Sequence, residues 1–522
     1  MLFFCGGLRP RAPGVFCGVC APAPQVLFCG GQAPEPPPYG ITCYIMPFTL
    51  RTHLVQSPVF AALLALSIGG IVGGAAAFGP LYALAGILGL LVGGAMLTST
   101  TVGMLAVFAV MTMLPFATLP FRAIITPNFL TLALVGLTAV WVLRMLARPD
   151  AYDLRMTPLG LPIFGFLGLT FFSLILGARG LPDTTTLHNY AKFVLGVLLF
   201  LSTVNCVRTR DQARLALRGL LISGGLAASV GLALWALNDQ LALQILVALG
   251  RIGYPTSGRV LRYVEDDPSG LERAIGFSVD PNSFGGMLAL IVALGAAQLV
   301  AEQPLMRRWL LGLFVTAMTL ALILTFSRTA LIGLIAAAVY LATLRYRRLW
   351  WVMLGGGMLA GILLFALGYA DDFINRFISG FQFRDQAQQM RLAEYANALA
   401  IIARYPAFGI GFGQAPDLDL TAGVSSIYLA IGQRIGLLGL AAFLATVATW
   451  FYQTIRALPQ LDAERTSWVL GCQAGIVAAL AVGIADHYFF NIEFSHMVAL
   501  FWGTMGLGMA VVGDVEGVRR ET

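Results

Sequence analysis

The sequence predicts an all-α integral membrane protein with about 12 to 14 transmembrane helices. The chain has 522 residues, of which 58% are hydrophobic and only 11% are charged. Its apolar stretches reach about 17 to 22 residues, enough at ~1.5 Å per residue to cross a ~30 Å hydrocarbon core. A soluble domain of this length would carry more charge and shorter apolar runs, so that class is excluded.

The apolar stretches and the charges between them together predict the topology. Fourteen candidate spans lie at about 58–78, 81–97, 101–120, 128–146, 158–177, 191–206, 219–237, 283–301, 309–326, 329–344, 349–370, 424–453, 467–485 and 492–513. If the first span starts inside, every short arginine cluster falls on one side, as the positive-inside rule requires. We therefore expect both termini in the cytoplasm and two long loops, 238–282 and 371–423, outside it.

The spans are expected to form a single transmembrane domain over residues 46–522. Residues 1–45 are rich in Pro and Gly and contain five of the seven cysteines. Cys17 and Cys20 form a C-x-x-C pair, but no His or second Cys pair accompanies them, so a metal or redox site is not predicted. We expect residues 1–45 to be disordered or to come from a misassigned start upstream of Met46.

The longer outer loop is expected to be partly helical. Between residues 390 and 404, apolar side chains recur at helical spacing, while Arg391 and Glu394 share another face of the helix. The apolar positions are Leu392, Tyr395, Leu399 and Ile402. A membrane protein that keeps one long loop structured is expected to use it for function.

Arg328 lies between two apolar segments, with no acid near it in sequence. One helix over residues 309–343 would be ~50 Å long, well beyond the bilayer, so a tight turn is expected at Ser327 and Arg328. A planar guanidinium at the membrane surface suits a phosphate or diphosphate group. Nucleic acid is not an expected partner, because the basic residues form no concentrated patch.

A second candidate anion site lies at the start of the eighth span. Asp280 followed by Pro281 predicts a helix start, with Asp as the N-cap and Pro in the first turn. The free N–H groups of that turn, together with Asn282, would lie beside Arg273 and could bind an anion. A well-capped membrane helix with no ligand is the alternative.

Four stretches in this order resemble the O-antigen ligase and polymerase family. They are RAIGFSVDPNSFGGML at 273–288, LTFSRTALIGL at 324–334, RLAEYANALAIIARYPAFGIGFG at 391–413 and IYLAIGQRIGLLGL at 427–440. The resemblance covers residues 273–440 and extends to the many-span architecture and the long outer loop.

The resemblance implies a glycosyltransferase at the outer face of the bacterial cytoplasmic membrane. Such enzymes transfer a glycan from an undecaprenyl diphosphate carrier to an acceptor saccharide, glycolipid or protein hydroxyl, in lipopolysaccharide or exopolysaccharide assembly. They need no nucleotide sugar, cofactor or essential metal. By matching motif, the residues that hold the diphosphate would be Arg273, Arg328 and Arg391. The sequence does not separate ligase from polymerase.

The sequence departs from the family where a base is needed. The family usually carries His-Asn just before x-Tyr-Leu, and its His is the proposed base for the acceptor hydroxyl. Ser425 and Ser426 occupy these positions here, and a serine hydroxyl cannot replace an imidazole as a base. His487, which Asp486 could orient, is the candidate base.

Weaker candidates and other functions stay open. His188 is a weaker candidate for the base, and Glu394 is expected to pair with Arg391. A transporter or flippase for a lipid-linked sugar would show broken helices and mid-span charge, whereas the spans are almost free of charge apart from Arg434. The missing His-Asn pair also leaves open an inactive relative that binds the carrier.

Overall fold

The computed structural model describes residues 58–77, 79–119, 127–147, 154–177, 182–366, 386–413 and 423–521. These residues form helices joined by loops, with no strand among them. The helices are α2 (Pro58–Ala77), α3 (Pro80–Thr98), α4 (Thr100–Met113), α5 (Phe129–Ala147), α6 (Gly160–Gly177), α7 (Thr184–Cys206), α8 (Arg210–Ala236), α9 (Asp239–Ala248), α10 (Pro281–Leu299), α11 (Arg308–Leu324), α12 (Arg328–Leu344), α13 (Arg348–Ala366), α15 (Gln386–Arg404), α16 (Ile427–Ala457), α17 (Ala463–Val482) and α18 (Ser495–Glu521).

The helix lengths confirm an all-α, multi-pass membrane protein. Seven of the described helices are long and apolar enough to cross a membrane, namely α5, α7, α8, α10, α16, α17 and α18. Shorter apolar helices, α11 and α12 among them, accompany these. Each of the fourteen expected spans overlaps a described helix. The chain divides into two compact units, Met1–Gly73 and Gly74–Thr522, and apart from α2 these helices belong to the second.

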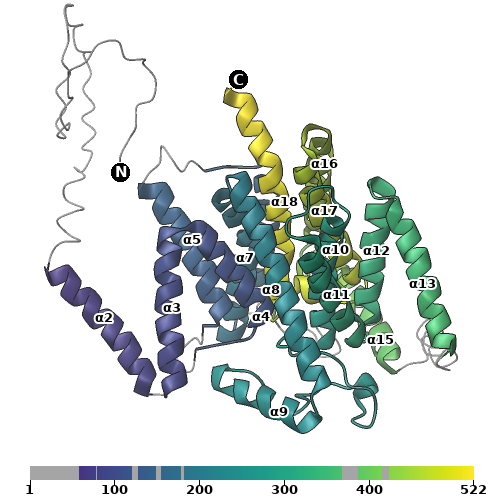
Figure 1. Cartoon of the computed structure of the whole chain (residues 1–522), viewed down its shortest axis with the longest axis horizontal. Helices are drawn as coiled ribbons and strands as arrows, with labels where there is room; N and C mark the ends of the chain where they lie inside the picture. Colours follow the sequence, from purple (N-terminus) through teal and green to yellow (C-terminus); the bar gives the residue numbers. More distant parts are fainter. Residues whose placement is uncertain are drawn as a thin grey trace, which may run out of the picture. The chain divides into compact units, whose positions relative to one another are not determined.

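Glycines let the central helices of the second unit approach one another closely (Figure 1). A Cβ added at Gly475 in α17 would lie 3.1 Å from the carbonyl oxygen of Leu290 in α10. One added at Gly333 in α12 would lie 2.8 Å from the carbonyl oxygen of Ala478 in α17. Transmembrane helices associate through such small residues, because lipid gives them little hydrophobic reason to pair. This packing fixes the ends of α10, α12 and α17, where the candidate site lies.

The two expected outer loops contribute α9 and α15, which lie at the same end of the second unit (Figure 1). The predicted helix over residues 390–404 is present as part of α15. Other parts of the expected outer loop and the N-terminal extension lie outside the described residues, at 1–45, 371–385 and 414–422.

Candidate functional site

Asp486 is a buried carboxylate in the segment that follows α17, with a side chain only 3% exposed. Its Oδ2 accepts a hydrogen bond from the hydroxyl of Thr329, in the first turn of α12. Its Oδ1 lies 3.5 Å from Nη2 of Arg391, in α15. The hydroxyl of Ser327, the N-cap of α12, is 3.0 Å from that of Thr329. One carboxylate therefore joins α12, α15 and the segment after α17.

Arg273 is held beside the first turn of α10. Asp280 is the N-cap of this helix and Pro281 occupies its first turn, both as predicted. Arg273 donates from Nε to the carbonyl oxygen of Thr325, at 2.7 Å, and from Nη2 to Oδ1 of Asn282, at 2.6 Å. These bonds use two of the five guanidinium N–H groups, so donors remain for a ligand.

The structure brings two of the three predicted diphosphate-binding arginines to Asp486. Arg391 pairs with it directly, and Arg273 is near enough for an electrostatic interaction. Arg328 is the first residue of α12, directly before Thr329, and its side chain is exposed. The predicted tight turn is present between α11 and α12 and places Arg328 at this end of the helix pair.

The environment of Asp486 makes its charge costly. Burial raises the pKa of this carboxyl to about 6, although Arg391 and the hydrogen bond from Thr329 act in the opposite direction. Desolvation penalises the charged form more than one partly exposed guanidinium stabilises it. The carboxylate is therefore ionised at pH 7 and takes up a proton in mildly acidic solution.

α15 packs both polar and apolar side chains against the protein, since Ala398 and Ile401 are fully buried. Arg391 and Glu394 are half-buried, whereas Leu392 and Leu399 are 44% and 56% exposed. The amphipathic pattern was predicted, but the expected pairing of Arg391 with Glu394 was wrong. Arg391 pairs with the buried carboxylate of Asp486 instead, while the carboxylate of Glu394 accepts hydrogen bonds from Ser425.

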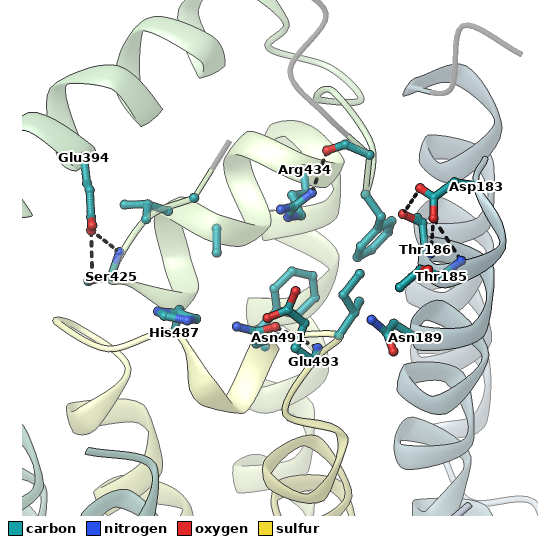
Figure 2. Close-up of a pocket in the computed structure, with 17 residues that line it drawn as sticks. Asp183, Thr185, Thr186, Asn189, Glu394, Ser425, Arg434, His487, Asn491 and Glu493 are labelled. Carbon is teal, nitrogen blue, oxygen red and sulfur yellow. Dashed lines mark hydrogen bonds between the residues drawn. The ribbon is translucent and has the colours of Figure 1, made fainter. Parts of the chain in front are cut away.

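A cavity of about 510 Å³ lies next to this cluster. Figure 2 shows Glu394, Ser425 and His487 at one end, Asn189 and the first turn of α7 at the other, and Arg434, Asn491 and Glu493 between them. Its wall also includes Phe412, Gly413, Gly423, Val424, Ala430, Phe490 and Ile492, along with Asp183, Thr185 and Thr186 of the α7 turn.

Ser425 and Ser426, which stand where the family carries His-Asn, lie at the start of α16. Glu394 accepts two hydrogen bonds from Ser425, from its backbone N–H at 2.9 Å and from its hydroxyl at 2.7 Å. Ser426 is the N-cap residue and is buried. Ser425 thus faces the cavity, paired with a carboxylate on α15.

His487 lines the same end of the cavity. Its ring stacks on Tyr488 with a centroid distance of 4.7 Å, and its buried Nδ1 has no hydrogen-bond partner among the described residues. Burial lowers the pKa of His487, so the imidazole is neutral at pH 7 and can accept a proton. Asp486 was expected to orient this ring, but it binds Thr329 and Arg391 instead. The wall at α7 contains Asn189 rather than the weaker candidate His188.

α16 is interrupted at Gly436, two residues after Arg434, which lines the cavity. Gly436 has φ 76°, and the turn that includes it leaves the carbonyl oxygens of Gln433 and Arg434 free of the helix ladder. The backbone N–H groups of Ile410 and Gly411 donate to these oxygens, at 3.0 and 2.9 Å. The Gly-rich loop at 406–413 therefore docks into the helix.

Sequence reasoning missed how these residues combine. From the sequence, Asp486 is expected to orient the ring of His487, not to pair with the arginines. Asn189 and Glu493 were not singled out, since nothing local marks them; only the packing of α7 beside the segment after α17 makes them neighbours. Arg434 is one of very few charged residues within the apolar spans, and this charge is the sequence signal that marks it.

Residues 312–444 match the family model described as O-antigen ligase. The matched segment begins in α11 and ends in α16, so it contains Arg328, Arg391, Glu394 and Ser425. Arg273 and His487 lie outside it. No curated protein matches the chain.

Proposed function

We propose, from the match of residues 312–444 to the O-antigen ligase family model, that this protein joins a lipid-linked glycan to an acceptor. The proposed role is that of a ligase-type or polymerase-type glycosyltransferase in polysaccharide assembly. The donor in this proposal is a glycan on undecaprenyl diphosphate. The acceptor is a hydroxyl of a saccharide or glycolipid, and the reaction takes place at the outer face of the bacterial cytoplasmic membrane.

The cluster of Arg273 and Arg391 around Asp486, with Arg328 beside it, is the observation that carries this proposal. In the reaction the bond from the anomeric carbon to the diphosphate oxygen breaks, and the diphosphate leaves with the electron pair. Guanidinium groups fixed in advance stabilise the negative charge that develops there. The bonds from Arg273 to Thr325 and Asn282 hold one such group in place before substrate arrives.

The acceptor hydroxyl forms the new bond to the anomeric carbon and gives up its proton. His487 is the base in our proposal, because it lines the cavity and because burial lowers its pKa, which keeps the ring neutral. Glu394 is the alternative base, since its carboxylate lies at the same end of the cavity. Its carboxylate already accepts two hydrogen bonds from Ser425, so His487 is the first choice.

Glycan transfer by the purified protein tests the proposal, with an undecaprenyl diphosphate oligosaccharide as donor. We expect Arg391→Ala to lower the transfer rate by about 10²-fold or more, the usual effect of removing one charge-stabilising donor. Arg404→Ala is the matched control, because Arg404 lies on the same helix but is exposed and away from Asp486. Equal rates for the two variants would contradict the diphosphate site.

The same assay shows whether His487 or Glu394 is the base. His487→Ala is expected to abolish transfer while Glu394→Gln retains it, and the reverse result would move the base to Glu394. Carrier binding without any transfer by the wild type would instead indicate an inactive relative that has lost the His-Asn pair.

A flippase for a lipid-linked glycan is the second candidate. The break in α16 beside Arg434 favours it, because broken helices with a nearby charge are typical of transporter sites. Movement of the carrier lipid across proteoliposome membranes, with no glycan transfer, would support this function instead.

A further inference from the structure

We infer that the cavity between α7, α15, α16 and the segment 487–493 binds the acceptor saccharide and selects uncharged or amino sugars over acidic ones. This rests on the proposed function and adds a substrate class to it. The volume of about 510 Å³ lies within the ~300–1,000 Å³ typical of small-molecule sites. Both candidate bases line one end, where an acceptor hydroxyl must lie to lose its proton.

The charge of the wall disfavours an anionic ligand. Among the described lining residues there are three carboxylates, those of Asp183, Glu394 and Glu493, and one guanidinium, that of Arg434. Asp183 also caps α7, and the ammonium group of Lys192 lies behind Asn189, so the excess of negative charge comes mainly from Glu394 and Glu493. Arg434 is already part of the wall, since its Nη1 donates to the carbonyl oxygens of Gly411 and Gly413, at 3.1 and 3.4 Å. The diphosphate therefore belongs at the arginine cluster, and a carboxylate on the sugar would be repelled here.

The polar groups in the middle of the cavity suit hydroxyl groups, which both donate and accept hydrogen bonds. Glu493 supplies an acceptor and lies within electrostatic range of Arg434, which supplies donors. The amide oxygen of Asn189 accepts from Lys192 at 3.2 Å, which leaves the amide nitrogen as a donor toward the cavity. The wall thus offers both donors and acceptors.

Apolar surface completes the site. Phe412 and Phe490 line the cavity and pack on each other, with centroids 6.2 Å apart, and they are only 4% and 6% exposed. They give a rigid apolar border to the cavity that the carbon-bound hydrogens of a sugar can contact, while its hydroxyl groups meet the polar wall. A flexible, strongly charged ligand would use neither surface.

Binding of free oligosaccharides to the full-length protein in detergent tests the inference without requiring transfer. The probes are a neutral trisaccharide, an amino-sugar trisaccharide and a uronate trisaccharide of the same size, measured by saturation-transfer NMR and titration. We expect the wild type to bind the first two at least tenfold more tightly than the uronate. Equal affinity for all three would overturn the inference.

Two variants locate the binding. Glu493→Gln is expected to reduce the preference against the uronate by threefold or more, because it removes a carboxylate from the wall. Glu302→Gln, at an exposed site in the loop between α10 and α11, is the matched control and should keep the wild-type preference. Thr185→Trp, at an exposed lining position, should weaken neutral-sugar binding at least tenfold. Unchanged preference in Glu493→Gln, or unchanged binding in Thr185→Trp, would overturn the inference.

The outcomes distinguish this inference from the function on which it rests. Selective sugar binding with no transfer from any donor would leave the sugar site in place and contradict the proposed transferase. Transfer to neutral and uronate acceptors at equal rates would support the transferase and contradict the selectivity.

Discussion

In the proposed transferase, Asp486 would control how much positive charge is free for the diphosphate. At pH 7 its carboxylate pairs with Arg391, so a bound diphosphate must compete with it for the guanidinium. Because burial raises the pKa of Asp486 to about 6, mild acid protonates the carboxyl and releases Arg391 from that competition. The charge of a sugar-linked diphosphate does not change over this range, since both phosphates are esterified.

We therefore expect donor lipid to bind more tightly as the pH falls. The protonated fraction of a group with a pKa near 6 rises by about tenfold between pH 7 and pH 5, which sets the largest gain in affinity that linkage allows. Titration of sugar-linked undecaprenyl diphosphate into the purified protein at several pH values measures this gain.

Asp486→Asn is the control for this effect. The amide cannot ionise, so the variant should bind donor at pH 7 as the wild type does near pH 5 and should lose most of the pH dependence. A pH dependence that persists in Asp486→Asn would assign the effect to another group, with His487 the next to test.

At the scale of elements, the joint between α16 and the loop at 406–413 depends on two glycines. Gly409 and Gly436 both have positive φ, 65° and 76°. A Cβ added at Gly436 would lie 2.2 Å from the carbonyl oxygen of Ala407, and one at Gly409 would lie 2.5 Å from that of Arg434. Rotation of a side chain cannot relieve either contact, because the atom that the added Cβ would meet belongs to the backbone.

Gly436→Ala is expected to separate the loop from α16. The backbone conformation of Gly436, with φ 76° and ψ −177°, is essentially restricted to glycine and costs about 1–3 kcal/mol for a residue with a Cβ, and the contact with Ala407 adds to this. The midpoint of thermal unfolding in detergent should fall by several degrees. Gly312→Ala in α11 is the matched control, since a Cβ there meets nothing within 4 Å. Equal midpoints for the two variants would contradict the close fit.

α15 shows which part of an element the sequence can predict. Its helical period was visible in the spacing of Leu392, Tyr395 and Leu399, and the helix is present. The direction of its polar face was not visible, because that depends on a buried carboxylate, Asp486, far along the chain. The protein-facing side therefore combines Arg391 and Glu394 with the buried Ala398 and Ile401, while Leu392 and Leu399 are exposed.

At the scale of the whole molecule, long apolar segments made the helices predictable, because a bilayer allows few alternatives to them. The candidate site was predictable only in part. The arginines and Asp280 carry local signals, such as a charge in an apolar context or an N-cap before Pro. The cavity wall has none, because α7, α16 and the segment 487–493 meet only through tertiary packing.

Contacts between distant loops agree with the topology expected from charge. Glu464, at the start of α17, binds Arg210 and Arg214 of α8, so two loops expected on the inside lie at one end. The backbone N–H of Thr118 donates to the carbonyl oxygen of Ile252 at 2.7 Å, which joins two segments expected outside. These pairs fix which loops share a side, and the positive-inside rule then predicts which side that is.

Labelling with a membrane-impermeant maleimide tests this assignment, in a variant whose native cysteines are replaced. Ser269→Cys lies in the exposed loop between α9 and α10 and should react in intact spheroplasts. Glu302→Cys, exposed between α10 and α11, should react only after the membrane is opened. Because one span separates the two positions, the reversed pattern would place Arg273 and its neighbours on the cytoplasmic side. The donor glycan would then have to be inside the cell, and transfer at the outer face would be contradicted.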